Sequence, residues 1–401
     1  MAVQKRIFYV VVPLLTTVFC LLVVLLVDHL LGRVFLEKVL RKIATEEREY
    51  RVSNPDYHHT LRPNYTTHNA AWGNIRYTIH TNSLGFKDES NRTVEKSPQK
   101  PRYVFIGDSF TEGIGHDWDE TFVGIFAKAR PDLEVLNAGV SSYSPIIYKK
   151  KLIWLVNNGY VFDEAVIYID ISDIQDEGFN YTYDNNDHLQ PDFKRCQWTY
   201  ISEYENTQSS AGAAPIQPSS TEPLALQKNQ SNRESPWISR YFPVTGHFVN
   251  LIRGFFSSGS FESAEGLSAP VGLIRGMWTF EKDLPCYGPT GIEGAIKKAT
   301  KHMTELADFL KERHIRFSVG VYPWPDQVLS DTVDSLQVQI WQKWCAENGC
   351  HKFIDHFPEF FAEKPPGSWP KELYMISDAH FSLKGNQLMA NKLLKVFPKS
   401  P

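Results

Sequence analysis

The longest apolar segment of the chain lies close to its N-terminus. Residues 7–27 carry no charged side chain and consist mainly of Val, Leu and Phe. A helix of about 20 residues crosses a lipid bilayer, whereas a cleaved signal peptide has a shorter apolar run of roughly 7–15 residues and a small-residue cleavage site. We therefore predict a short tail over residues 1–6, followed by an uncleaved, single-pass transmembrane anchor over residues 7–27.

The next segments are mixed in polarity. Residues 28–50 combine apolar and charged side chains at near-helical spacing, which is typical of a short juxtamembrane helix but equally of a plain spacer. Residues 51–100 are rich in Asn, Thr, His and Tyr, and apolar and polar positions alternate over residues 74–80. Alternation with a period of two indicates β-strands, so we predict an N-terminal extension with edge strands or a hairpin.

From residue 101 onward, short apolar runs alternate with amphipathic segments. The runs at 103–106, 134–136 and 165–169 have the composition of strands that are buried on both faces of a parallel sheet. Strands that alternate with helices form βαβ units. We therefore predict an α/β domain over residues 101–401, a three-layer α/β/α sandwich around a central parallel sheet, with further helices at 291–313, 334–348 and 383–396 and further strands at 316–322 and near 353–354.

One part of this domain departs from the pattern. Between residues 203 and 235 the composition shifts to Ser, Gln, Ala, Pro and Asn, with few large apolar side chains. Such a segment cannot bury enough apolar surface to fold on its own. We predict a flexible surface insertion at about 203–285 that contributes no catalytic residue.

Charge and cysteine content narrow the function classes. With 42 basic and 46 acidic residues, the chain has a net charge of -4 and no general attraction for nucleic acid. The charges on either side of the anchor do not favour one orientation in the membrane. No cysteine pair has zinc-site spacing, so we expect neither a metal nor a cofactor. One cysteine, Cys20, lies in the anchor; the others are an even set that fits either two disulfides in an oxidising compartment or four buried thiols: Cys196, Cys286, Cys345 and Cys350.

A candidate nucleophile follows the first core strand directly. Residues 107–113 read GDSFTEG and precede a helical stretch. In a doubly wound sheet, ligands bind beyond the carboxyl ends of the strands, where helix N-termini supply positive potential. Ser109 is therefore expected to point into such a crevice.

A serine hydroxyl needs a neighbouring base to become a nucleophile. The loop before the last helix contains Asp378 and His380, so that the carboxylate could hold one imidazole nitrogen while the other faces Ser109. Donors for a developing oxyanion are expected from the backbone of Ser109 and Gly139 and from Ser172, at the ends of the first three core strands.

These residues resemble the motifs of a known family. The block at 107–113 resembles the GDS(L) nucleophile motif of SGNH hydrolases, and Gly139 within Asn137-Ala138-Gly139 is similar to their second block. Residues 82–86 and 113–122 look like segments of bacterial membrane-anchored SGNH proteins. The resemblance covers residues 82–181 and the tail beyond 316. It implies a flavodoxin-like SGNH fold and a site outside the cytoplasm, on the periplasmic side of an inner membrane if the protein is bacterial.

The chain departs from the family pattern in two places. Where the family has G-x-N-D, residues 170–173 read DISD, so that Ser172 stands in place of the oxyanion asparagine. The usual D-x-x-H spacing is shortened to D-x-H, which leaves Ser377 in the slot of the acid. If Asp378 cannot reach the imidazole, Asp355 is the reserve acid.

The resulting prediction is a serine esterase that removes O-acyl groups from a glycan or lipid at the outer face of a membrane. An O-acyltransferase that uses the same residues and a sugar hydroxyl as acceptor is a second hypothesis, because exclusion of water is a property of the folded cleft. A third is an inactive protein that binds glycan or a membrane partner, which the missing asparagine and the shifted acid would explain.

Overall fold

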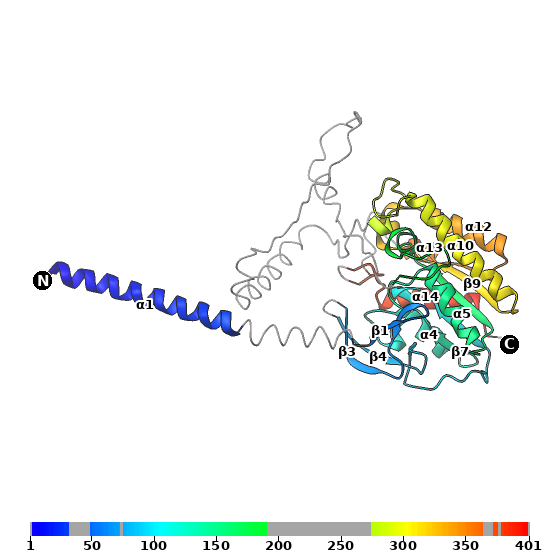
Figure 1. Ribbon diagram of the computed structural model, residues 1–401, viewed down its shortest axis with the longest axis horizontal. Coiled ribbons are helices and arrows are strands. Elements are labelled where there is room, and N and C mark those ends of the chain that lie inside the picture. Colours follow the sequence, from blue (N-terminus) through cyan, green and yellow to red (C-terminus); the bar gives the residue numbers. More distant parts are fainter. Residues whose placement is uncertain are drawn as a thin grey trace, which may run out of the picture. The chain divides into compact units, whose positions relative to one another are not determined.

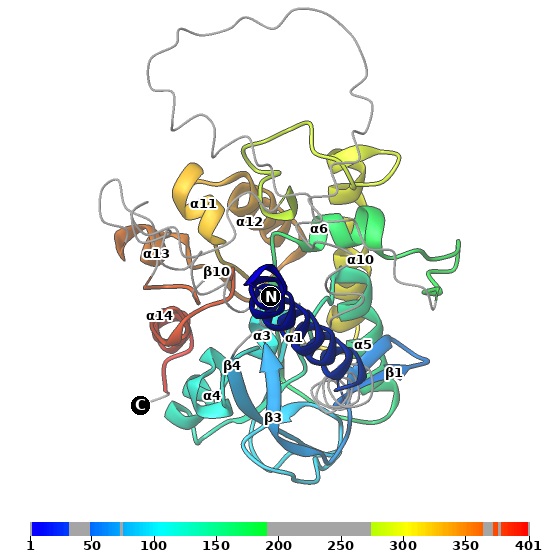
Figure 2. The same ribbon diagram turned by 90° about the vertical axis from the view of Figure 1, so that its left-hand side faces the viewer.

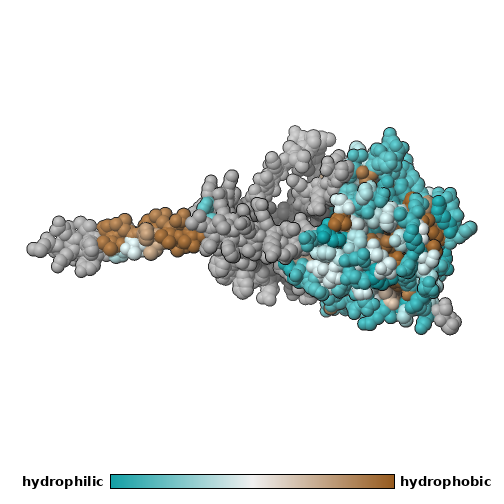
Figure 3. Space-filling model, turned by 60° about the horizontal axis from the view of Figure 1, so that its bottom comes forward, coloured by the Kyte–Doolittle hydropathy of each residue, from teal (hydrophilic) through white to brown (hydrophobic). Residues whose placement is uncertain are grey.

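The computed structural model describes residues 2–31, 49–72, 75–190, 274–363, 372–375 and 378–399. The chain divides into two compact units, one made of residues 1–46 with 211–265 and the other of residues 47–210 with 266–401. In the first unit, α1 (Ala2–Leu31) is a long helix whose segment Val11–His29 is long and apolar enough to cross a membrane, by length and composition alone. Its described side chains are mostly hydrophobic (Figure 3). Most of the predicted spacer at 28–50 lies outside the described residues.

The second unit is built on an eight-stranded sheet with the strand order β10-β9-β8-β6-β7-β5-β4-β3. The first five strands in this order are parallel and the last three join antiparallel, so the predicted parallel core is confirmed and is extended at one edge. The parallel strands are β6 (Arg102–Ile106), β7 (Glu134–Asn137), β8 (Glu164–Ile169), β9 (Arg316–Val321) and β10 (Phe353–Asp355). The antiparallel strands are β3 (Thr66–Trp72), β4 (Ile75–Thr81) and β5 (Lys87–Asp88).

Helices cover both faces of the sheet and complete the three predicted layers (Figure 1). Figure 2 shows α4 and α14 together on one side of the strands, and α5 and α10 on the other. The first pair is α4 (Phe122–Ala129) and α14 (Leu383–Val396). On the other side, α10 (Gly291–Lys311) packs on α5 (Pro145–Asn157) and on α12 (Leu336–Asn348), and α10 and α12 contact β9. All residues of β6 and β8 are buried, as expected for central strands covered on both faces.

The N-terminal extension joins the parallel core through β5, which pairs with β7, and β4 and β3 follow as an antiparallel hairpin at the edge of the sheet. A separate hairpin, β1 (Arg51–Asn54) and β2 (His58–Leu61), precedes it. The guanidinium of Arg51 donates two hydrogen bonds, of 2.9 and 2.7 Å, to the buried carboxylate of Glu112. Glu112 belongs to the GDSFTEG block and also accepts a hydrogen bond from the backbone N–H of Ser141. The extension is thereby tied to the segment that carries the candidate nucleophile.

The cysteines and the insertion refine the sequence-based expectations. Cys345 and Cys350 form a disulfide at the end of α12, and Cys286 is also disulfide-bonded. The alternative of four buried free thiols is therefore wrong.

The predicted insertion at about 203–285 lies mostly outside the described residues, but its end is folded, because Trp278 is buried and donates a hydrogen bond to the carbonyl of Ile171. Burial of a large apolar side chain such as Trp278 stabilises the fold, which explains why this end of the segment packs on the sheet domain.

Replacing Gly85 with alanine should destabilise the fold strongly. Gly85 has φ +70°, and a Cβ there would lie 2.2 Å from the carbonyl oxygen of Leu61. The matched control is Gly349, which has φ +71° and no atom within 4 Å of the added Cβ. We expect Gly349→Ala to lower the free energy of unfolding by about 1 kcal/mol and Gly85→Ala by about 3 kcal/mol or more, measured by urea unfolding. Equal losses would contradict the proposed clash.

Candidate active site

The candidate nucleophile stands at the carboxyl edge of the parallel sheet. Ser109 is the first residue of the short helix α3 (Ser109–Glu112), which follows β6 between its neighbours β7 and β8. The next two parallel strands in the sequence, β7 and β8, pair with opposite sides of β6, so β6 is a topological switch point. Doubly wound sheets bind their ligands at such points. Gly107 makes the tight exit from the strand, because a Cβ there would lie 2.2 Å from Thr111 Oγ1.

The structure brings the three predicted residues into one hydrogen-bonded chain. Ser109 Oγ lies 2.7 Å from His380 Nε2, although 271 positions separate the two residues. On the other side of the ring, His380 Nδ1 lies 2.5 Å from Asp378 Oδ1. The carboxylate can only accept, so Nδ1–H donates to Asp378 and leaves Nε2 free to accept the hydroxyl proton of Ser109. This is the arrangement that a nucleophile, a base and an orienting acid require.

A tight turn explains how the shortened D-x-H spacing still works. Asp378 Oδ1 accepts a hydrogen bond of 2.8 Å from the backbone N–H of His380, two residues further on, as in an Asx-turn. The loop is closed by the backbone bond from Met375 N–H to the carbonyl of His380. The reserve acid, Asp355, accepts a hydrogen bond from Phe357 N–H at the end of β10, and none of its described contacts is with His380. Ser377 lies outside the described residues.

A residue that sequence reasoning missed completes the surroundings of the acid. The indole Nε1–H of Trp72, at the end of β3, donates a hydrogen bond of 2.5 Å to Asp378 Oδ2. The Trp72 ring also packs edge-on against the His380 ring, with 5.1 Å between centroids. Nothing in the local sequence of β3 indicates this contact, because the partners are 306 positions apart.

The charges around His380 favour its protonated form. Burial by itself lowers the pKa of His380, but the carboxylate of Asp378, and beyond it Asp108 and Asp170, outweigh burial and raise it above the ordinary value. Burial works in the opposite sense on Asp378, yet its bonds with His380 and Trp72 hold its pKa at about 2. Asp378 therefore stays ionised and stabilises the imidazolium that forms when His380 takes a proton.

Three buried carboxyl groups lie close together next to Ser109: Asp108, Asp170 and Asp173. Asp170 accepts hydrogen bonds from Ser172 N–H and Trp324 Nε1–H. Burial, and then the charge of Asp170, raise the pKa of Asp108 to about 8. Ser109 Oγ lies 3.2 Å from Asp108 Oδ2, further than from His380, so the imidazole is the better acceptor for the hydroxyl proton.

The three predicted oxyanion donors differ in whether they already donate a hydrogen bond within the protein. No described residue accepts a hydrogen bond from the Ser109 backbone N–H, at the start of α3. The Gly139 N–H already donates to Asn137 Oδ1 at 3.1 Å, so it is not available in this arrangement. Ser172 is buried and its hydroxyl does not cap the helix that follows. Within the described part of the chain, the Ser109 backbone N–H and the Ser172 hydroxyl are therefore the two predicted donors that no acceptor engages.

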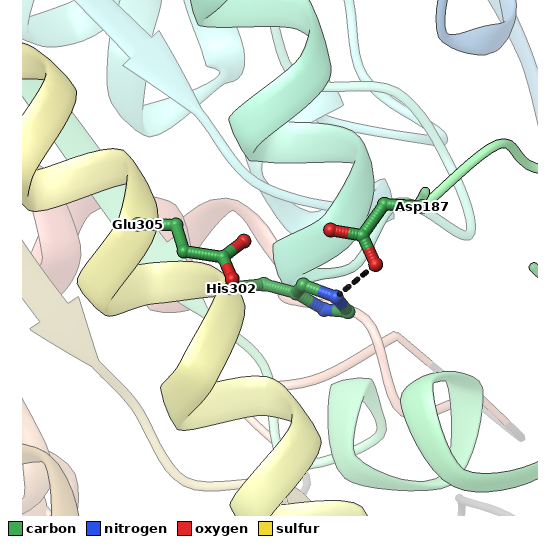
Figure 4. A group of neighbouring side chains, drawn as sticks. All are labelled: Asp187, His302 and Glu305. Carbon is green, nitrogen blue, oxygen red and sulfur yellow. Dashed lines mark ion pairs between the residues drawn. The ribbon is translucent and has the colours of Figure 1, made fainter. Parts of the chain in front are cut away.

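A second polar cluster, Asp187, His302 and Glu305, lies where α10 packs on α5 and on the loop after β8 (Figure 4). His302 Nε2 points toward Asp187 Oδ1 at 3.5 Å, while His302 Nδ1 lies 2.8 Å from Glu177. The ammonium group of Lys149 lies 2.6 Å from a carboxylate oxygen of both Asp187 and Glu305. Lys301 Nζ also lies 3.8 Å from Asp187 and 3.6 Å from Glu305, so two lysines balance the two carboxylates. The cluster is an ion-pair network that ties these elements together.

The architecture is the three-layer α/β/α sandwich that the sequence predicts, with the GDS block after β6 and the Asp/His loop before α14. No protein-family model and no curated protein matches the sequence. Among solved structures, a lipolytic protein of the G-D-S-L family from Veillonella parvula is similar, with 12% identity over 75% of this chain and 99% of that chain and a TM-score of 0.38. A catalytic mutant of an acetylxylan esterase from Geobacillus stearothermophilus matches with 12% identity over 76% of this chain and 98% of that chain, with a TM-score of 0.37. At these values neither activity nor substrate carries over to this chain.

The raised pKa of His380 can be measured directly. We expect the His380 ring to titrate above pH 6.5 in the wild type, and Asp378→Asn to lower its pKa, because the substitution removes the negative charge that stabilises the imidazolium. NMR of protein labelled in its histidine rings reports both values. Asp355→Asn is the control and should leave the His380 pKa unchanged. Titration of His380 below pH 6.5 in the wild type would contradict this assignment.

Proposed function

We propose that this chain is a serine hydrolase of the SGNH type that acts as an O-acyl esterase on an acylated glycan or lipid outside the cytoplasm. The observation that carries the proposal is the 2.7 Å contact between Ser109 Oγ and His380 Nε2, with Asp378 on the far side of the ring. A serine with a purely structural role does not require a buried imidazole that a carboxylate orients. This contact is the main argument against the inactive binding protein.

The chemistry follows from this geometry. His380 takes the hydroxyl proton as Ser109 Oγ attacks the ester carbonyl, and a tetrahedral intermediate with a negatively charged oxygen forms. The bond to the leaving alkoxide then breaks, and His380 Nε2–H returns the proton to that oxygen. Water then attacks the acyl-serine while His380 takes a proton from it, the bond from Ser109 Oγ to the acyl carbon breaks, His380 returns the proton to Oγ, and the free acid leaves. Throughout, Asp378 holds the ring and stabilises the imidazolium.

In this proposal, two donors that no described residue engages bind the negatively charged oxygen. The backbone N–H of Ser109 stands at the helix start, next to the reacting hydroxyl. The Ser172 hydroxyl takes the part of the family's asparagine, with a shorter reach. A well-placed donor contributes about 3 kcal/mol to transition-state stabilisation, so Ser172 sets much of the rate in this proposal.

The proposed location rests on the apolar helix and the disulfides. Val11–His29 is long enough to anchor the chain in a membrane, which would hold the enzyme near membrane-bound or cell-surface substrates. The Cys345–Cys350 disulfide is typical of a compartment that is not reducing. We infer that the unit that carries Ser109 lies on the extracytoplasmic side.

An O-acyltransferase is the second candidate, and the burial of the site favours it. Ser109 is 8% exposed and the His380 side chain 12% exposed. The Phe110 ring packs against the imidazole at 4.6 Å between centroids. A site that limits the access of water gives the acyl-serine time to react with a bound sugar hydroxyl. The two candidates are distinguished by their product when a soluble glycan acceptor is added. The esterase would yield a free acid and the transferase an acylated glycan, and mass spectrometry follows both products.

Reactivity toward a fluorophosphonate probe tests the nucleophile. We expect the probe to label the wild type, not to label Ser109→Ala, and to label His380→Ala at least 10³-fold more slowly, because an unassisted serine hydroxyl is a poor nucleophile. Ser97→Ala, which alters an exposed serine, is the control and should be labelled like the wild type. Labelling is measured by gel fluorescence. Undiminished labelling of Ser109→Ala would refute the proposed nucleophile.

The role of Ser172 is tested by kinetics with p-nitrophenyl acetate. We expect Ser172→Ala to lower kcat by roughly 10² with little change in KM, since the lost hydrogen bond is made mainly to the charged oxygen of the transition state. A kcat equal to that of the wild type would show that another group binds this oxygen.

A further inference from the structure

The N-terminal extension reaches the proposed active site through the end of its edge hairpin. β3 ends at Trp72, which pairs with Ile75 at the start of β4. A Cβ placed on Gly115, just after the nucleophile helix, would lie 2.9 Å from Met375 Sδ and 3.9 Å from Ile75 Cδ1. The end of the hairpin, the turn after α3 and the Asp/His loop therefore meet at one place.

The hairpin is held firmly enough to place a side chain. The backbone N–H of Thr78 donates a hydrogen bond of 2.6 Å to Asp117 Oδ1, which joins β4 to the segment after α3. Farther along the hairpin, the Thr81 hydroxyl donates to the carbonyl of Arg62 at 2.6 Å. These bonds hold β4 in place, and the backbone pairing of β3 with β4 in turn holds Trp72 in place.

The two oxygens of Asp378 have different donors. Oδ1 accepts from the backbone N–H and the ring Nδ1–H of His380. Oδ2 accepts from Trp72 Nε1–H, and no other described residue donates to it. The Asp378 side chain is 24% exposed, so without the indole this oxygen would exchange hydrogen bonds with water and the carboxylate could rotate about its last bond. The indole therefore holds Oδ1 toward the imidazole.

We propose that Trp72 is a positioning residue of this active site: its indole N–H fixes the carboxylate of Asp378, and thereby the ring of His380, for proton transfer from Ser109. This inference rests on the proposed function. It makes the hairpin of the extension a part of the active site, since the parallel core alone supplies Ser109, His380 and Asp378 but not the donor that orients the acid. The edge-on contact of the Trp72 ring with the His380 ring also helps to fix the orientation of the imidazole.

A double-mutant cycle on the full-length protein tests this role. Steady-state hydrolysis of p-nitrophenyl acetate is measured for the wild type, Trp72→Phe, Asp378→Asn and the double variant. Phenylalanine keeps an apolar ring but removes the donor. We expect Trp72→Phe to lower kcat about tenfold with KM unchanged, which is the scale of one hydrogen bond to a charged group. In the Asp378→Asn background, the same change should alter kcat by less than about twofold, because Trp72 acts through that carboxylate.

The matched control is Trp154→Phe. Trp154 is also half-buried and packs on aromatic rings, Tyr57 and Tyr160, but it has no described contact with the site. It should leave kcat unchanged. Thermal unfolding of every variant is recorded, and the cycle stays decisive if Trp72→Phe is less stable, because a general loss of structure lowers the rate equally in both backgrounds.

Each outcome decides for or against the inference. A tenfold loss in the Asp378→Asn background as well would show that Trp72 does not act through Asp378, and a wild-type kcat for Trp72→Phe would show that the bond is not needed; both overturn the inference. Ser109→Ala is measured beside them. If it retains the wild-type rate, the proposed function fails; if it is inactive while Trp72→Phe is fully active, only the role of Trp72 fails.

Discussion

The hydrogen bond between Ser109 and His380 is the contact on which the proposed chemistry depends. It joins the first turn after a central strand to the loop before the last helix, and it forms only if β6, β8 and β9 pair in the observed order and α14 packs on α4. The strand order at the carboxyl edge of the sheet is not sufficient by itself to form this contact. The Asx-turn at Asp378 and the hairpin that carries Trp72 bring the imidazole to the correct side of the serine.

Buried acidic groups next to this contact give the site its electrostatic character. Asp108, Asp170 and Asp173 lie within one cluster, and burial together with their mutual repulsion raises the pKa of Asp108 and Asp173. Whatever negative charge remains on them favours the imidazolium form of His380. The same charge opposes a developing oxyanion nearby, so the donors that bind the oxyanion must lie on the other side of Ser109 or outweigh that repulsion. The raised pKa of Asp108 and Asp173 reduces the negative charge near this oxygen and so limits the conflict.

Most of the core and three of the site residues could be predicted from the sequence, because these elements and residues lie in local sequence patterns that can be recognised. β6 and β8 are apolar after their first, charged residue, α14 begins and ends where its amphipathic pattern does, and Ser109 lies in a motif at a strand end. Trp72 left no such pattern, since its role depends on a contact across the whole chain. The engagement of the Gly139 N–H by Asn137 is likewise a tertiary detail that no spacing reveals.

The most direct test of the central claim is to trap the covalent intermediate. The protein is mixed with an excess of p-nitrophenyl acetate, quenched in acid within the first turnover, digested and mapped by mass spectrometry. If Ser109 is the nucleophile and His380 its base, an acetyl group will be found on Ser109 in the wild type and will be absent from the same peptide of His380→Ala. Acetylation spread over lysines and other surface groups, with Ser109 unmodified, would contradict the account.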